Sequence, residues 1–300
     1  MINNIEYTEV DSLEALAEEV NLKAEESEGI HNLVVTCSIS ADNLKSNSLL
    51  DVTDDAKKWI AVECPDDLHI NHGEYVKEGM DHIITELKSK PSSNRALYSL
   101  ISQDHISLSG DKPIPSFLIF QTKWVGSELY ASVYLRALET HRFLRINLEE
   151  IRLRLVQILE SVNQIKSVNL CLHSFYAYCN TSIVPLVKPK IDLLNSPTMG
   201  KILRLEPQNM FNLLEEKSNN STVVDLTAIQ MLKDIIVADP PDRLDSIKED
   251  ILLMLDDCIA KGNILKKRRE TTSHCEDLEK TSTDFSSSLL ELAKRLSNEP

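Results

Sequence analysis

Cysteine and histidine side chains lie near one another in the sequence at Cys64, His69 and His72, and such side chains can hold a zinc ion. A structural zinc site needs four ligands, and no fourth ligand is evident at a suitable spacing. We therefore interpret these residues as part of an ordinary loop. The sequence also has no glycine-rich phosphate loop, no HExxH zinc motif and no GxSxG nucleophile motif. Generic motifs thus assign no chemistry to the chain.

A more informative set of polar residues lies in the segment 115–147, which reads PSFLIFQTKWVGSELYASVYLRALETHRFLRIN. This segment resembles the active-site stretch of thymidylate synthases and pyrimidine-nucleotide hydroxymethylases. In that family a Pro-Cys-His sequence is followed at fixed intervals by Gln, Leu, Tyr, an Arg-Ser-x-Asp sequence and Asn. The residues of this chain that fall on those intervals are Pro115, Gln121, Leu129, Tyr134, Arg136, Glu139 and Asn147.

The resemblance continues on both sides of this segment and covers about residues 70–190. Upstream, Asn94 and Arg95 stand at the two positions of the arginine pair in the family's Pro-x-Ser-Arg-Arg sequence. Downstream, Tyr178 and Asn180 match the tyrosine and asparagine of its His-x-Tyr-x-Asn sequence. The two ends of the chain have no counterpart in the family.

The resemblance implies a binding site for a pyrimidine nucleoside monophosphate. Arg136 would bind the phosphate, because a guanidinium group meets an anionic oxygen group with two parallel donors. Arg95 would reach the phosphate across a two-fold axis, so the resemblance also implies a homodimer. Asn147 offers a donor and an acceptor to a pyrimidine edge, and Tyr178 can donate to a sugar hydroxyl.

Gln121 and Glu139 complete the set of nucleotide-binding residues that the resemblance implies. A structural alternative stays open for two members of the set. Asn147 can cap the helix that follows it, and Arg136 can pair with Glu139. For Asn147 the two roles are compatible.

The residues that carry out the family's chemistry are replaced in this chain. The family uses a thiolate that adds to C6 of the pyrimidine and makes C5 nucleophilic, whereas the nucleophile position here is Ser116. A serine hydroxyl needs an adjacent base, and the family's neighbouring histidine is Phe117. Further departures are Asn94, Ala137 and Tyr176, and the absence of any arginine before Arg95. We therefore expect no catalytic residue at this site.

Three interpretations of function remain. We favour a catalytically altered or inactive thymidylate-synthase-like protein, a dimeric pyrimidine-nucleotide-binding or interaction module without a cofactor. The alternative is a methyl- or hydroxymethyltransferase that modifies C5 of a pyrimidine nucleotide by an altered mechanism, with a folate as its cofactor. A cysteine such as Cys179 could then serve as the nucleophile, although on a strand its side chain would alternate away from Tyr178. In the third interpretation the chain is an α+β interaction protein and the resemblance is fortuitous.

The charge of the chain limits its partners. Lys and Arg number 32 against 47 Asp and Glu, a formal net charge of -15, which disfavours sequence-independent binding to nucleic acid or to anionic membranes. Residues 71–200 alone are slightly basic, with 14 basic and 12 acidic side chains. A small anionic ligand is therefore compatible with the middle of the chain.

The same sequence indicates a soluble, cytoplasmic protein. No apolar run reaches the length of about 18 residues that a membrane-spanning helix needs. The N-terminus is acidic and helix-like, so we expect no signal peptide. The six cysteines form no CxxC pair and are expected to be reduced thiols.

The residues of interest need a framework of strands and helices. Runs rich in β-branched and aromatic residues predict strands at 32–38, 59–63, 95–102, 117–124, 128–135 and 168–179. Two of these strands flank Gly126 and are expected to form a hairpin. Apolar residues at helical spacing predict helices that begin near Leu13, at Met80 and at Asn147.

After Pro207 the apolar spacing becomes mostly helical. We therefore predict an α+β fold in which residues 1–200 form a thymidylate-synthase-like mixed sheet packed with helices. Residues 201–300 are expected to form a mainly helical extension, which could contact a protein partner.

Overall fold

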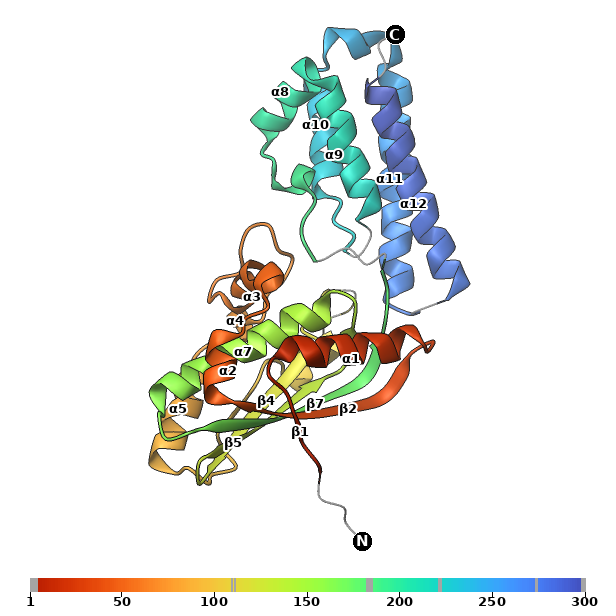
Figure 1. Ribbon diagram of the computed structural model, residues 1–300. Helices are drawn as coiled ribbons and strands as arrows, with labels where there is room; N and C mark the ends of the chain where they lie inside the picture. The colour runs from red at the N-terminus through yellow and green to blue at the C-terminus, as the bar shows by residue number, and fades with distance from the viewer. Residues whose placement is uncertain are drawn as a thin grey trace. The chain divides into compact units, whose positions relative to one another are not determined.

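The computed structural model describes residues 5–108, 110, 112–181, 186–220, 223–272 and 275–297. It is an α+β protein that divides into two units (Figure 1). The second unit begins at Leu186, before the boundary at residue 200 that the sequence suggested. It also takes in the short segments 66–69 and 109–113, and the remaining residues before Leu186 form the first unit.

The first unit contains a mixed sheet, as the sequence predicted. Its strands are β1 (Thr8–Glu9), β2 (Ile30–Ser40), β3 (Leu97–Ser99), β4 (Phe117–Val125), β5 (Glu128–Leu135), β6 (Leu138–Glu139) and β7 (Ser167–Tyr178). Their order across the sheet is β1-β2-β7-β5-β4-β3, with β6 also paired to β7. The expected hairpin is confirmed, because β4 and β5 pair in antiparallel register on either side of Gly126. At the centre β5 and β7 run parallel.

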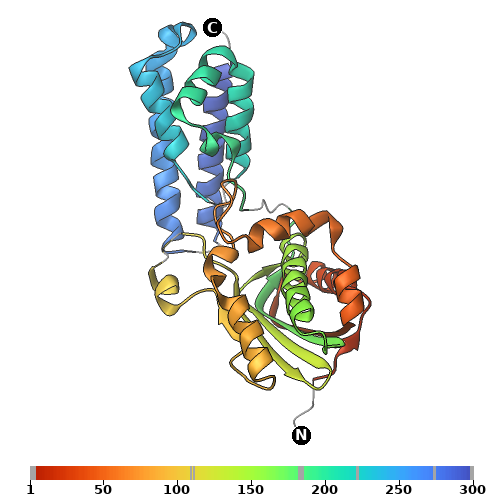
Figure 2. The same ribbon diagram turned by 90° about the vertical axis from the view of Figure 1, so that its left-hand side faces the viewer.

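Helices pack on one side of this sheet, where α1, α2 and α7 lie together (Figure 1). The helices of the first unit are α1 (Leu13–Glu25), α2 (Ala41–Ser46), α3 (Thr53–Ile60), α4 (Gly73–Val76), α5 (Gly79–Ser89), α6 (Gln103–Leu108) and α7 (Phe143–Ser161), with a 3-10 turn at Leu50–Val52. α7 contacts α1, α2, α3 and α5, so it is the central helix of the unit (Figure 2). This position explains why charged residues of α7 are buried along with its apolar ones.

Side chains alternate between the two faces of the sheet, as strand geometry requires. On β5, Leu129, Ala131, Val133 and Leu135 are buried toward the helices. The opposite face, which we term the open face, carries apolar side chains that are partly in solvent. They are Val34, Ile119, Val125 and Phe175, each 39–53% exposed.

The predicted strand at 59–63 is wrong, because Thr53–Ile60 forms helix α3. Ala56 and Trp59 are buried on one side of this helix, and Asp54 and Asp55 occupy its first turn, where a negative charge favours the helix dipole. The short apolar run at its end matched a strand because periodicity cannot separate the two structures over so few residues.

The second unit is mainly helical, as the sequence predicted. Its helices are α8 (Ser196–Leu205), α9 (Pro207–Asn219), α10 (Thr227–Ala238), α11 (Lys248–Arg269) and α12 (Glu276–Ser297). One 3-10 turn, Lys190–Leu193, precedes α8, and another, Asp242–Ile247, precedes α11. A buried ion pair links Lys217 of α9 to Asp192, with Nζ 2.6 and 2.7 Å from the two carboxylate oxygens. Their side chains are 4% and 3% exposed. Within the part of the chain that the structure describes, no helix combines the length and the apolarity needed to cross a bilayer.

The segment 66–69 belongs to the second unit because it pairs with the residues that open the main part of that unit. Leu68 forms an isolated antiparallel bridge with Val187. His69 N–H donates to the Leu186 carbonyl at 2.9 Å, and Lys188 N–H donates to the Asp67 carbonyl at 2.8 Å. The second unit is therefore assembled from parts of the chain that are far apart in the sequence.

Gly73, the first residue of α4, is expected to tolerate no side chain. A Cβ atom there would lie 2.0 Å from the Ala61 carbonyl oxygen and 2.5 Å from that of Ile60. Because backbone atoms cannot turn aside, Gly73→Ala should lower the free energy of unfolding by roughly 1–3 kcal/mol. Tryptophan fluorescence during chemical denaturation measures this loss, since both tryptophans, Trp59 and Trp124, lie in the first unit.

Gly200→Ala in α8 is the control, and its unfolding is followed by circular dichroism because Gly200 lies in the second unit. The Cβ atom there would meet only the flexible end of Arg204 at 3.2 Å and Ile235 Cγ2 at 3.8 Å, an ordinary van der Waals contact. A change within about 1 kcal/mol is expected for it. Equal losses in the two variants would contradict the packing argument.

Candidate functional site

Some of the sequence-predicted site residues lie together at the carboxyl ends of the central strands β5 and β7. β5 and β7 are parallel, so their carboxyl ends lie side by side. Arg136 follows β5, and Tyr178 ends β7. Ser116 precedes β4, and its carbonyl accepts the Arg136 backbone N–H at 2.9 Å. Topology therefore brings together Ser116, Arg136 and Tyr178, which are far apart in the sequence.

Backbone carbonyls of the segment before β4 hold the Arg136 guanidinium. Nε donates to the Pro115 carbonyl at 3.2 Å, and Nη2 donates to the Ile114 carbonyl at 3.1 Å. Burial of the guanidinium lowers the Arg136 pKa, while the nearby Tyr178 raises it. An arginine stays protonated in either case. The side chain is therefore a positioned cation that is still partly open to solvent.

Tyr178 stacks on Tyr176, with ring centroids 5.6 Å apart and an interplanar angle of 20°. Burial raises the Tyr178 pKa, Glu139 and Tyr176 raise it further, and Arg136 lowers it. The phenol therefore stays a neutral hydroxyl donor at physiological pH. The Tyr176 hydroxyl in turn donates to the Glu28 carbonyl at 3.3 Å. These contacts fix the ring of Tyr178 beside the arginine.

Glu139 is 4% exposed and accepts hydrogen bonds from four backbone N–H groups. Oε2 accepts from Arg142 at 2.9 Å and from Phe143 at 3.1 Å. Oε1 accepts from His141 at 2.6 Å and from Asn180 at 3.3 Å. A carboxylate in this place satisfies donors at the start of α7 and complements the helix dipole. The structure thus gives Glu139 a backbone-holding role, and it forms no ion pair with Arg136 among the described residues.

The expectation that Asn147 caps the following helix is wrong. α7 begins at Phe143, so Asn147 lies inside the helix, where it is 6% exposed. The cap function passes to Glu139, because its side chain can reach the free N–H groups from the preceding strand.

Arg95 and Gln121 lie elsewhere, on the β3–β4 side of the sheet. Gln121 pairs with Leu97, and its Nε2 donates to the Asn94 carbonyl at 2.9 Å. Lys123 Nζ donates to the Asn94 side chain at 3.3 Å. Arg95 follows this anchored residue and is exposed. Gln121 therefore positions the loop that carries Arg95, away from the carboxyl ends of β5 and β7.

A second polar centre, which sequence reasoning missed, is buried in the first unit. His72 Nδ1 lies 2.6 Å from Glu150 Oε2, and the two side chains are 5% and 1% exposed. The imidazole packs on Trp59 at 4.7 Å and on Phe117 at 5.6 Å between ring centroids. The partners are 78 residues apart in sequence, so no local pattern could have revealed the pair. His72 is thus a structured interior residue and not part of an ordinary loop.

Several buried polar atoms beside this pair have no hydrogen-bond partner among the described residues. They are Glu150 Oε1, Tyr98 Oη, and Nε and Nη2 of Arg154. Arg154 Nη2 lies 3.9 Å from Glu150 Oε1, too far for a hydrogen bond. Polar atoms in this state are commonly satisfied by buried water.

Cys179, which follows β7, and the sheet cysteines Cys37 and Cys171 have raised pKa values. Burial, followed by the charges of Glu25 and Glu139, raises the Cys179 pKa. Burial also raises the Cys171 pKa, and it raises the Cys37 pKa to about 12. Because the thiolate is the reactive form, a raised pKa lowers the reactivity of these thiols at neutral pH.

The second unit has a groove of about 1000 Å³ between α8, α10 and α11. Apolar residues such as Met231, Ile235 and Ile259 line it together with the charged Arg204 and Asp239. Arg204 Nη2 donates to the Asp239 carbonyl at 2.9 Å. The groove is a candidate contact surface on the helical extension.

Comparison of the sequence with protein-family models gives no match, and comparison with curated proteins gives none either. The resemblance to thymidylate synthases therefore stays a prediction from the sequence motifs.

Proposed function

We propose that the first unit is a thymidylate-synthase-like module that binds a pyrimidine nucleoside monophosphate and has lost methyl-transfer chemistry. The binding edge consists of Arg136 and Tyr178, with Ser116 at the position of the family's nucleophile. Asn147 on α7 would read the base edge, and Glu139 would keep the start of α7 in place. No cofactor is needed for binding alone.

The observation that carries this proposal is that Arg136 and Tyr178 both lie at the carboxyl ends of the parallel strands β5 and β7, where each affects the pKa of the other. A phosphate needs a positioned cation, and the guanidinium is positioned by the Pro115 and Ile114 carbonyls at 3.2 and 3.1 Å. A nucleoside also offers hydroxyls, which a neutral phenol can contact. The edge supplies both functions within one set of contacts, beside a serine that lacks an adjacent histidine base.

Arg136→Ala is expected to weaken nucleotide binding by about 1.5–3 kcal/mol, the contribution of hydrogen bonds to a charged group. Calorimetric titration of the full chain with dUMP, dCMP, UMP and CMP measures the effect and identifies the preferred base and sugar. Among the described residues the guanidinium donates its hydrogen bonds to backbone carbonyls and forms no ion pair, so the variant should fold normally.

Arg295→Ala is the matched control, since Arg295 is a partly exposed arginine of α12, 3.3 Å from Asp250. It should leave the affinity unchanged. Absence of binding for all four nucleotides would refute the nucleotide proposal. An unchanged affinity in Arg136→Ala would show that the nucleotide binds at another place on the protein.

A homodimer is part of the proposal. Arg95 lies on the β3–β4 side of the sheet, away from Arg136, and in the resembled family its counterpart acts on the partner's phosphate. The open face, with Val34, Ile119 and Phe175 half in solvent, is the surface that a second copy would cover. Light scattering should find a dimer that Val34→Lys combined with Ile119→Lys converts to a folded monomer. A monomeric parent protein would contradict this part of the proposal.

The transferase alternative is less well supported. It requires a nucleophile, and the raised pKa of Cys179 leaves little thiolate at neutral pH. It also requires a folate donor. The alternative predicts tritium release from C5-labelled nucleotide in the presence of folate, whereas the binding module predicts none.

For the second unit we propose contact with a protein partner. The groove between α8, α10 and α11 is large and partly apolar, and Leu205 and Leu253 are exposed on the same unit. Apolar surface of this kind is typical of protein contacts.

A further inference from the structure

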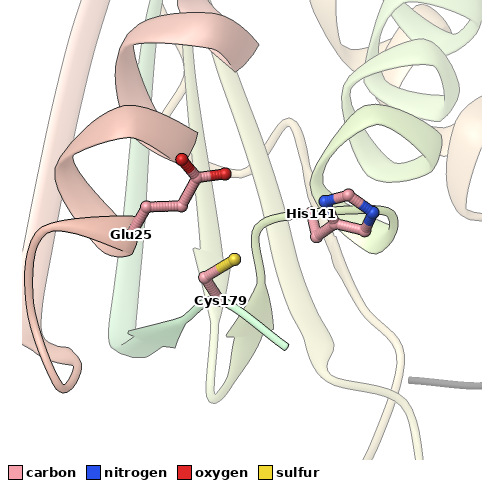
Figure 3. A group of neighbouring side chains, drawn as sticks. All are labelled: Glu25, His141 and Cys179. Carbon is pink, nitrogen blue, oxygen red and sulfur yellow. The ribbon is translucent and has the colours of Figure 1, made fainter. Parts of the chain in front are cut away.

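Three side chains with metal-binding atoms converge on one point of the first unit. Glu25 is the last residue of α1, His141 precedes α7, and Cys179 follows β7. One ligand atom of each lies within 4.8 Å of the others. Figure 3 shows the three side chains pointing into the same space. Glu25 and His141 are exposed and Cys179 is partly buried, so an ion could enter from solvent.

Hydrogen bonds orient the carboxylate of this group. Asn21, one turn earlier in α1, donates from Nδ2 to Glu25 Oε1 at 2.7 Å. Oδ1 of the same Asn21 side chain accepts from Thr140 Oγ1 at 3.1 Å. Thr140 is the neighbour of His141, so one amide connects the carboxylate to the loop that carries the imidazole. Metal ligands are commonly held by such outer contacts.

A single buried atom fixes the spacing of the other two ligands. Glu139 Oε1 accepts the His141 N–H at 2.6 Å and the Asn180 N–H at 3.3 Å. Thr140 N–H also donates to the Tyr178 carbonyl at 2.9 Å. The backbones on both sides of the thiol and the imidazole are therefore tied together without use of the ligand atoms.

We propose that Glu25, His141 and Cys179 form a binding site for a zinc-class divalent ion, with a fourth position for water. The donor set of one sulfur, one nitrogen and one oxygen suits Zn²⁺, whereas Mg²⁺ and Ca²⁺ prefer oxygen ligands only. Zn–S bonds of about 2.3 Å and Zn–N bonds of about 2.0 Å in tetrahedral geometry place ligand atoms about 3.5 Å apart. Small rotations of the exposed Glu25 and His141 side chains bring the group to that spacing. On binding, the thiol of Cys179 loses its proton to solvent and the sulfur bonds to the ion.

The ion would join the end of α1 to the loop before α7 and to the end of β7. It would thus stabilise the same edge of the sheet that carries Tyr178. Binding of the ion does not require a nucleotide, so this proposal is independent of the proposed function.

Metal binding to the full chain, stripped with a chelator, tests the site. Zn²⁺ is titrated by calorimetry and Co²⁺ by absorption, because a cobalt–thiolate bond gives a charge-transfer band. One ion per chain is expected, with no competition from Mg²⁺. Cys179→Ser should abolish the cobalt–thiolate band. His141→Ala and Glu25→Gln should each weaken Zn²⁺ binding by at least about tenfold, and Asn21→Ala, which removes an outer contact, by about tenfold.

Cys275→Ser and His105→Ala are the matched controls, a thiol of the second unit and an exposed imidazole on α6. Both should keep the parent affinity, and circular dichroism should find every variant folded. A cobalt–thiolate band that persists in Cys179→Ser, an unchanged Zn²⁺ affinity in His141→Ala, or no binding of either ion would overturn the proposal. Loss of nucleotide binding with intact Zn²⁺ binding would refute only the proposed function.

Discussion

Glu139→Gln is expected to destabilise the first unit by about 3–6 kcal/mol, since two charge-assisted hydrogen bonds of about 1.5–3 kcal/mol each are lost. The carboxylate accepts four backbone N–H groups with its two oxygens. The amide keeps one oxygen and directs its NH₂ group at two of those donors. The start of α7 is then left with buried, unpaired N–H groups, which are costly.

Chemical denaturation followed by tryptophan fluorescence measures this loss. Glu160→Gln is the control, because Glu160 is an exposed residue of the same helix. It should change the free energy of unfolding by no more than about 0.5 kcal/mol. If the two variants unfold alike, the carboxylate of Glu139 does not hold the start of α7 as described.

Lys217→Met should destabilise the second unit by about 3–5 kcal/mol, because it leaves the buried carboxylate of Asp192 without its counter-charge. The double variant Asp192→Leu with Lys217→Met removes both charges and should lie within about 1 kcal/mol of the parent. Chemical denaturation, monitored by circular dichroism, compares the free energy of unfolding of the single and the double variant. A double variant as unstable as the single one would show that shape, and not charge, makes the pair important.

The cost of Lys217→Met should depend on pH. Burial raises the Asp192 pKa, and Lys217 opposes that rise. Without the lysine the pKa of the folded variant rises further above the unfolded value of about 3.9, so the folded state holds the proton to higher pH. The variant therefore loses stability as the pH rises through this window. Its deficit should be large at neutral pH and small near pH 4, and a deficit that is constant with pH would contradict the assignment.

The sequence predicted the elements whose local pattern is strong. The β4–β5 hairpin followed from runs rich in β-branched and aromatic residues on both sides of Gly126, and α7 followed from its apolar spacing. Its start was misplaced because the capping carboxylate of Glu139 precedes the helix and acts through tertiary structure. The run after Trp59 was assigned to a strand because it was too short to reveal its period.

The sequence named residues of the candidate site only where they belong to a recognisable motif. Arg136 and Tyr178 were named in advance, and the parallel pairing of β5 and β7 brings them together. The His72–Glu150 pair could not be predicted, because its partners are 78 residues apart. A buried histidine also has the same local sequence as one in a loop, so only packing distinguishes them.

The pairing of residues 66–69 with the residues after Leu186 has a consequence for any attempt to separate the two units. A fragment that begins at Leu186 would lack the partner of Val187, and a fragment that ends before it would retain an orphan segment. A cut at Leu186 therefore divides the backbone pairing of the second unit between the two fragments. Truncation or domain exchange at Leu186 should therefore destabilise the second unit.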